Sequence, residues 1–247
     1  MKKKSFAAWC ARERIAAVGA LMDLTDFHQI ALDTNCRVQR GTRPAVGLCR
    51  FRARRSDMTG DERDLALRRL AEAVELLKEE MDPDLIPEVG TNIAYALEKA
   101  RSPEDVAAVE GRIVRLGDQV HPVGEIAFGT SDHMARIVLT AMRFDRRVRA
   151  AANIRFADFL IEELEEMMLD IRYFDRVQEP PGIKTMDWGV ASCCKTGVPD
   201  IIYDRGAVGK EPMIRILGED PMEVAHNILK LSRLIKDTKL RDRCEWE

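Results

Sequence analysis

The sequence predicts an α/β fold in which helices cover the faces of a β-sheet. Apolar residues recur at helical spacing in several segments, most clearly between residues 65 and 77. Short apolar segments bounded by glycine, proline or aspartate are typical of strands. Because the two kinds of segment alternate along the chain, the sheet is expected to pack against helices.

The first helix is expected to begin at Thr59, which forms a capping-box pattern with Glu62, and to run to Glu80. Its apolar stripe comprises Leu65, Leu70, Ala73, Val74 and Leu77. Pro83 and Pro87 end it. The segment "SPED" at 102–105 predicts a second helix start, with Ser102 as the cap.

Strands and helices then interleave. Strands are predicted at 111–116 and 120–128, around a turn at Gly117-Asp118, and again at 170–175, 199–204 and 211–217. Helices are predicted at about 132–142, 145–152, 158–169 and 220–236.

Composition excludes several classes of protein. The chain has 247 residues, of which 46% are hydrophobic and 33% charged, and its net charge is −3. No apolar run is long enough to span a membrane. The basic start, "MKKKSFAAWC", is followed by Arg12 and Glu13 rather than by a signal-peptide core. We therefore expect a cytoplasmic protein without a membrane contact.

Six cysteines are scattered without a CxxC pattern, so reduced thiols are expected. They are Cys10, Cys36, Cys49, Cys193, Cys194 and Cys244. The adjacent pair at 193–194 is read as buried apolar residues in preference to a redox site. No histidine pair has metal-ligand spacing, so no metal site is predicted.

Residues 1–58 form a basic N-terminal segment. The first 56 residues hold 12 Lys or Arg against four acids. Such a segment can contact nucleic-acid phosphates, and a degenerate helix-turn-helix module is one interpretation. A packed or irregular basic segment is the favoured alternative, so nucleic acid is not expected as the main partner.

The segment "FGTSDHMARIVL" at 128–139 is the first candidate site. Gly129 permits a tight turn, and Ser131 is a good helix N-cap. The first amides of a helix lack internal acceptors and suit an anion. His133 would lie at the edge of such an anion pocket, or it is simply a surface histidine; spacing alone leaves both open.

Two other segments are weaker candidates. "DRGAVGKEPMIRIL" at 204–217 offers Gly206, Gly209 and Lys210 to a phosphate, although it is not a Walker A loop. "PPGIKTMDWG" at 180–189 offers Lys184 and Asp187. Among the other histidines, His121 is expected to be packed in a strand, His226 to be solvated, and His28 to lie in the N-terminal segment.

Taken together, the ordered motifs resemble those of the ThiN domain, a thiamine-phosphate synthase domain, over about residues 65–237. They are "IPEVGTNIAYAL" (86–97), "EDVAAVEGRIVR" (104–115), "FGTSDHMAR" (128–136), "RAAANIRF" (149–156), "GIKTMDWG" (182–189) and "PDIIYDRGAVGKEPMIRILG" (199–218). The resemblance implies that residues 59–240 form a three-layer α/β/α domain with a mixed, largely antiparallel sheet. That architecture is aldolase-like and similar to the C-terminal domain of hydroxymethylpyrimidine kinases.

The resemblance also implies an enzyme, an alkyl transferase that joins hydroxymethylpyrimidine diphosphate to hydroxyethylthiazole phosphate. The products are thiamine phosphate and pyrophosphate. The family's arginine of the GRI motif and histidine of the FGxSxH motif map to Arg112 and His133, which are the expected catalytic residues. The expected substrate-binding residues are Asn92, Gly129, Ser131, Asn153, Lys184, Asp187, Asp204 and Lys210.

Further expectations follow from the resemblance. A diphosphate substrate is compatible with Mg²⁺, no organic cofactor is expected, and a homodimer is expected. The alternative function is a transcriptional regulator that senses thiamine phosphate through a ThiN-like domain. Asp187 and Thr185 stand where the family usually has Glu and Ser, which puts fine substrate positioning in question.

Overall fold

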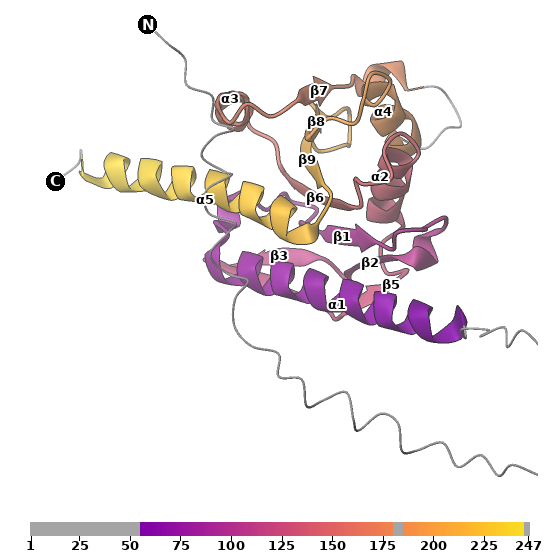
Figure 1. Ribbon diagram of the computed structural model, residues 1–247. Coiled ribbons are helices and arrows are strands. Elements are labelled where there is room, and N and C mark those ends of the chain that lie inside the picture. Colours follow the sequence, from indigo (N-terminus) through magenta and orange to yellow (C-terminus); the bar gives the residue numbers. More distant parts are fainter. Residues whose placement is uncertain (1–54, 180–184, 245–247) are drawn as a thin grey trace, which may run out of the picture. The chain divides into compact units, whose positions relative to one another are not determined.

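A computed structural model describes residues 55–179 and 185–244 (Figure 1). Most of the basic segment 1–58, His28 and Lys184 lie outside the described residues, and so do the predictions made for them. No helix among the described residues is long and apolar enough to cross a membrane.

A seven-stranded sheet forms the centre of the domain, in the order β5-β2-β1-β6-β9-β8-β7. The strands are β1 (Ile93–Ala96), β2 (Val106–Val109), β5 (Ile126–Phe128), β6 (Ala150–Arg155), β7 (Ile171–Tyr173), β8 (Ile201–Asp204) and β9 (Met213–Gly218). Neighbouring strands are antiparallel except for β7 and β8, which are parallel. The mixed, largely antiparallel sheet implied by the resemblance is therefore confirmed.

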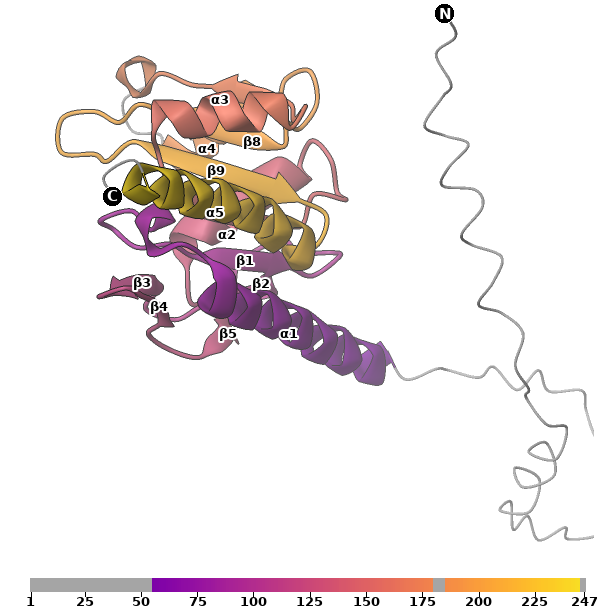
Figure 2. The same ribbon diagram turned by 90° about the vertical axis from the view of Figure 1, so that its left-hand side faces the viewer.

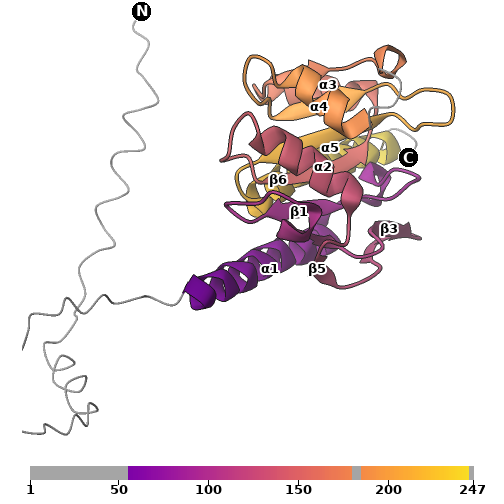
Figure 3. The same cartoon turned by 90° about the vertical axis from the view of Figure 1, so that its right-hand side faces the viewer.

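Helices cover both faces of this sheet (Figures 2 and 3). One face carries α1 (Arg55–Glu80), α3 (Asp158–Glu166) and α5 (Pro221–Cys244). The other carries α2 (Asp132–Met142) and α4 (Thr185–Cys193). The hairpin of β3 (Ile113–Leu116) and β4 (Gln119–Pro122) forms a separate two-stranded sheet, turning at residues 117–118 as predicted. The domain is thus a three-layer α/β/α sandwich.

The central strands separate two apolar cores. In β1, Ile93 and Tyr95 belong to the core under α1 and α5, whereas Ala94 and Ala96 belong to the core under α2. A strand buried on both faces shows no alternation of polar and apolar residues. This explains why β1 was not predicted.

The predicted helix at 145–152 is wrong, because Ala150 begins the central strand β6. Alanine favours helices in isolation, but here tertiary packing overrides that preference. Ala150 and Ala152 face one core and Ala151 the other. Small side chains fit where a strand is covered by helices on both sides.

Four local predictions also need correction. Helix α1 already includes Arg55, so Thr59 is not its cap; Glu62 instead accepts a hydrogen bond from the amide of Glu98, at 2.7 Å. Leu65 of the predicted stripe is 48% exposed. The "SPED" segment forms only one 3₁₀ turn, Pro103–Asp105, because β2 begins at the next residue. His121, expected to be packed, is exposed on β4.

Candidate functional site

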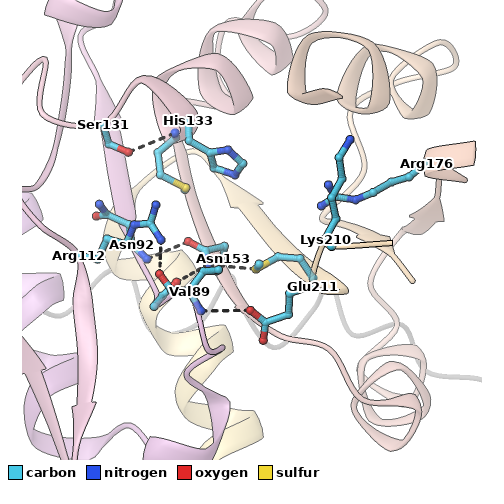
Figure 4. Close-up of a pocket in the computed structure, with 13 residues that line it drawn as sticks. Val89, Asn92, Arg112, Ser131, His133, Asn153, Arg176, Lys210 and Glu211 are labelled. Atoms are coloured by element: carbon cyan, nitrogen blue, oxygen red, sulfur yellow. Dashed lines mark hydrogen bonds between the residues drawn. The ribbon is translucent and has the colours of Figure 1, made fainter. Parts of the chain in front are cut away.

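A cavity of about 240 Å³ lies where the first turn of α2 meets the loops at one end of the sheet (Figure 4). The residues that line it come from six parts of the chain. They are Val89, Gly90, Asn92, Arg112, Ser131, His133, Met134, Asn153, Arg176, Gly209, Lys210, Glu211 and Met213. The predicted pair Arg112 and His133 therefore shares one cavity, although neither is close to the other in sequence.

Arg112 is the residue immediately before β3, and it borders the cavity. Its backbone has φ +79°, a conformation that costs free energy for any residue with a Cβ atom. Its guanidinium donates a hydrogen bond to the carbonyl oxygen of Val89, which lies in the loop before β1. One terminal nitrogen of Arg112 is thus engaged, while the rest of the guanidinium borders the cavity.

His133 stands in the first turn of α2, as the sequence predicted. The hydroxyl of Ser131 accepts a hydrogen bond from the amide of Met134 and caps the helix. Gly129 makes the preceding turn with φ +79°. The remaining first-turn amides and the positive end of the helix dipole give this corner of the cavity a preference for anions.

The pKa of His133 is lowered from 6.5 to about 4. The largest cause is desolvation: the ring is solvent-accessible, but it stands in a concave cavity whose walls displace water from around it. The cations of Arg215, Arg112 and Arg176 lower it further. The imidazole is therefore neutral at pH 7 in the ligand-free protein, and the field around it is positive.

Arg176 is a cavity residue that the sequence did not suggest. It begins a 3₁₀ helix, Arg176–Gln178, and Nε and one terminal nitrogen bind the two oxygens of Asp204, at 2.5 and 3.1 Å. Asp204 also pairs with Arg215, at 2.8 Å. Asp204 and Arg215 are fully buried, and Arg215 lies over the ring of Phe174.

Asp204 consequently has a different place from the one predicted. It does not line the cavity; it lies beneath it, holds Arg176 and accepts a hydrogen bond from the amide of Gly206, at 2.8 Å. Its carboxylate therefore orients Arg176, which lines the cavity, and does not border the cavity itself.

The turn between β8 and β9 supplies Lys210. Gly206 has φ +74°, and a Cβ atom there would lie 2.5 Å from the carbonyl oxygen of Lys210, so only glycine fits. Lys210 forms an ion pair with Glu179, at 3.1 Å. Glu211 accepts hydrogen bonds from the amides of Glu88 and Val89, at 2.9 and 3.1 Å, and so joins this turn to the loop before β1.

Asn92 and Asn153 border the cavity, but the chain itself uses much of their hydrogen-bonding capacity. Asn92 accepts from the amides of Ile93 and Val109 and donates to the carbonyl of Val109. Asn153 accepts from the amide of Asn92 and donates to the carbonyl of Gly90. Both are buried, and these bonds hold the cavity wall in shape.

Asp187 lies away from the cavity. It pairs with Arg136, at 3.0 Å, and borders a different hollow with Arg101 and Arg143. Its position does not support the predicted contact with substrate. The described residues include no group of three or more His, Cys, Asp or Glu that could hold a metal ion.

Cys193 and Cys194 are buried free thiols at the end of α4. Burial raises the pKa of both, that of Cys194 to about 11. Neither lines the cavity. Their reading as small apolar residues is therefore supported.

Comparison with known proteins places the chain in a family. The model of thiamine-phosphate synthase ThiN matches residues 69–230. The thiamine-phosphate synthase ThiN of Methanothermobacter thermautotrophicus is 38% identical over 162 residues, which cover 63% of this chain and 85% of that protein. The bifunctional thiamine biosynthesis protein ThiDN of Methanocaldococcus jannaschii is 43% identical over 183 residues; the match covers 72% of this chain but only 43% of that longer protein.

A solved structure agrees with the sequence comparisons. The crystal structure of the C-terminal domain of a phosphomethylpyrimidine kinase has a TM-score of 0.65 and 43% identity, covering 69% of this chain and all of that domain. The matched segment, residues 69–230, includes the strands of the central sheet and the residues that line the cavity. The chain therefore belongs to the thiamine-phosphate synthase ThiN family.

Proposed function

We propose that this protein is a thiamine-phosphate synthase, which joins hydroxymethylpyrimidine diphosphate to hydroxyethylthiazole phosphate. One observation carries the proposal: Arg112 and His133 line the same cavity, at the positive end of α2. The relative from Methanothermobacter thermautotrophicus, most of whose length this chain matches, bears the name of the same activity.

The reaction replaces a carbon–oxygen bond with a carbon–nitrogen bond. The bond between the pyrimidine's methylene carbon and the diphosphate oxygen breaks, and pyrophosphate leaves with the electron pair. The thiazole nitrogen donates its lone pair to that carbon and becomes the quaternary nitrogen of thiamine phosphate. Negative charge grows on the departing oxygen, so fixed positive groups beside it lower the barrier.

Arg112 is suited to that task. A guanidinium has five N–H donors in a planar fork that matches two phosphate oxygens. The bond to the Val89 carbonyl occupies one terminal nitrogen and fixes the direction of the side chain. The strained backbone of Arg112 is consistent with a residue held in place for binding.

His133 donates a hydrogen bond to the leaving group. The ring is neutral in the empty cavity, because the pKa is about 4. A bound diphosphate places negative charge beside the ring, which raises the pKa and favours the protonated form. We infer that His133 carries a proton while the diphosphate is bound and gives it to pyrophosphate as the bond breaks.

A magnesium ion would be held mainly by the diphosphate. The two glutamates near the cavity, Glu179 and Glu211, already bind Lys210 and backbone amides, so the described residues do not form a ligand cage. Mg²⁺ usually binds such substrates through phosphate oxygens, keeping several waters. A requirement for Mg²⁺ stays a prediction, and so does the homodimer, which sedimentation equilibrium would test.

Product formation tests the proposal directly. Purified protein is incubated with both substrates, and thiamine phosphate is measured by fluorescence after oxidation to the thiochrome. We expect wild type and His226→Ala, which alters an exposed histidine on α5, to form product at equal rates. His133→Ala should lose at least about 100-fold, within the range of general acid catalysis.

The regulator is the main alternative, and it depends on the basic segment outside the described residues. No observation on the described residues favours it. Tight binding of thiamine phosphate without any synthesis, together with retention of DNA, would establish the regulator and end the enzyme proposal.

A further inference from the structure

Arg176, Asp204 and Arg215 form a buried cluster with excess positive charge. The side chain of Arg176 is 9% exposed, and those of Asp204 and Arg215 are 0% exposed. Among the described residues, Asp204 is the only carboxylate that forms an ion pair with either arginine. Two guanidinium groups thus share one carboxylate, and the surplus charge reaches the cavity at Arg176.

A buried charge without a partner is costly. Burial accordingly lowers the pKa of Arg215, and the carboxylate of Asp204 opposes that effect. The cost falls when an anion binds at Arg176. The cluster is therefore arranged to accept negative charge from a ligand, in addition to stabilising the fold.

The cavity has two ends, and Arg176 stands at the end away from Arg112. A hollow of about 370 Å³ shares His133, Arg176 and Lys210 with the cavity. A second hollow, of about 590 Å³, shares Arg112 and the loop at 89–90 with it. The two hollows have no residue in common. In Figure 4, Arg112 lies on one side, Arg176 and Lys210 lie on the other, and His133 lies between them.

The number of donors differs between the ends. Nε and one terminal nitrogen of Arg176 are directed at Asp204, which leaves one edge of the guanidinium for a ligand. Lys210 adds one ammonium group, shared with Glu179. The opposite end combines most of the Arg112 guanidinium with the start of α2 at Ser131, and His133 lies between the two ends. The end with more donors suits a diphosphate, and the end at Arg176 suits a single phosphate group.

We propose that Arg176, held in position by Asp204, binds the phosphate ester of the thiazole substrate at the end of the cavity opposite Arg112. The pyrimidine diphosphate then lies at the Arg112 end, and the reacting carbon and nitrogen meet beside His133. This assignment rests on the proposed function. It adds Arg176 to the binding residues and places each substrate at its own end of the cavity.

Binding and kinetics together test the assignment. The dissociation constant for hydroxyethylthiazole phosphate is measured by calorimetry, and KM is measured for each substrate. Arg176→Gln should weaken binding of the thiazole phosphate about 10-fold to 100-fold, the loss expected for a hydrogen bond to a charged group. KM for the pyrimidine diphosphate should change less than about threefold. Arg176→Lys should recover part of the binding, because it keeps the charge.

A purely structural role for Arg176 would not affect recognition of one phosphate. Wild type is therefore also assayed with hydroxyethylthiazole that lacks the phosphate. The preference of wild type for the phosphorylated thiazole should shrink in Arg176→Gln and stay unchanged in Arg147→Gln, which alters an exposed arginine paired with Asp145. Thermal unfolding of each variant confirms that it is folded at the assay temperature.

The outcomes separate the two proposals. If wild type forms no thiamine phosphate but binds the thiazole phosphate through Arg176, the function is wrong and the assignment of the phosphate site stands. If folded Arg176→Gln binds the thiazole phosphate as wild type does, or if KM rises for the diphosphate instead, the assignment is overturned.

Discussion

Removal of the Asp204 carboxylate should be among the most destabilising substitutions in the domain. Asp204→Ala leaves Arg176 and Arg215 without their shared ion-pair partner, and Arg215 has no access to solvent. It also removes the acceptor for the amide of Gly206. Both losses occur in the buried layer beneath the cavity.

The magnitude follows from these contacts. Removing one partner of a buried ion pair costs about 3–5 kcal/mol, because the remaining charge stays buried. Since two arginines lose one carboxylate, we expect at least about 4 kcal/mol. This is a large part of the roughly 5–15 kcal/mol that holds a domain folded. The melting temperature should fall by roughly 8–16 °C for a domain of this size.

Urea unfolding, followed by circular dichroism, measures the loss. The matched control is Asp158→Ala, which removes an exposed carboxylate from its pair with Arg205, at 2.8 Å. Exposed pairs contribute no more than about 1 kcal/mol, so this variant should unfold almost as wild type does. Asp204→Asn, which keeps the shape and one acceptor, should lie between the two. Equal stability of Asp204→Ala and Asp158→Ala would refute the account of a buried, charge-bearing cluster.

Three further outcomes are expected. Arg112→Gly should be about 1 kcal/mol more stable to urea than Arg112→Ala, because glycine adopts φ +79° without strain. Both variants should form product about 100-fold more slowly than wild type. Equal stability of the two would argue against backbone strain. In nuclear magnetic resonance titrations, His133 should titrate near pH 4 in the free protein and at a higher pH with pyrophosphate. An unfolded histidine binds a proton near pH 6.5. The contribution of His133 to the free energy of unfolding is therefore fully present above pH 6.5 and is lost as the pH falls toward 4. A titration midpoint near 6.5 in the free protein would contradict the lowered pKa. Cys193 and Cys194 should resist thiol reagents until the protein unfolds, because both are buried and their pKa values are raised; rapid labelling of the native protein at either would show an open site.

The parts of the fold that were predicted correctly carry strong local signals. Helix α2 runs over residues 132–142 as expected, because Ser131 caps it and its apolar residues follow helical spacing. The hairpin around residues 117–118 was also predicted, since a glycine turn joins two short apolar segments. Such signals depend on neighbours in sequence and need no knowledge of the rest of the fold.

The central strands could not be predicted in the same way. Residues 93–96 and 150–155 are rich in alanine and are buried between two layers of helices. Without alternation, periodicity does not distinguish a buried strand from a helix. The resemblance to a family supplied the sheet type, which the residue pattern alone left open.

Only part of the candidate site could be predicted from the sequence. Arg112 and His133 stand in motifs that the resemblance marked, and they share a cavity. Arg176 has no such motif around it, and only the tertiary fold brings it beside Lys210 and above Asp204. Asp187 occupies a motif position but turns toward Arg136. A motif therefore identifies candidate site residues more reliably than it predicts where their side chains point.

The rate of thiamine phosphate formation in two arginine variants shows whether the cavity bordered by Arg112 is the catalytic site. Arg112→Ala removes a guanidinium from the cavity, and Arg101→Ala removes one from the separate hollow beside Asp187. With both substrates saturating for wild type, we expect Arg101→Ala to form thiamine phosphate and pyrophosphate in equal amounts at the wild-type rate. Arg112→Ala should be slower by about 100-fold or more. Equal rates in the two variants would show that the cavity bordered by Arg112 and His133 is not where the carbon–nitrogen bond forms.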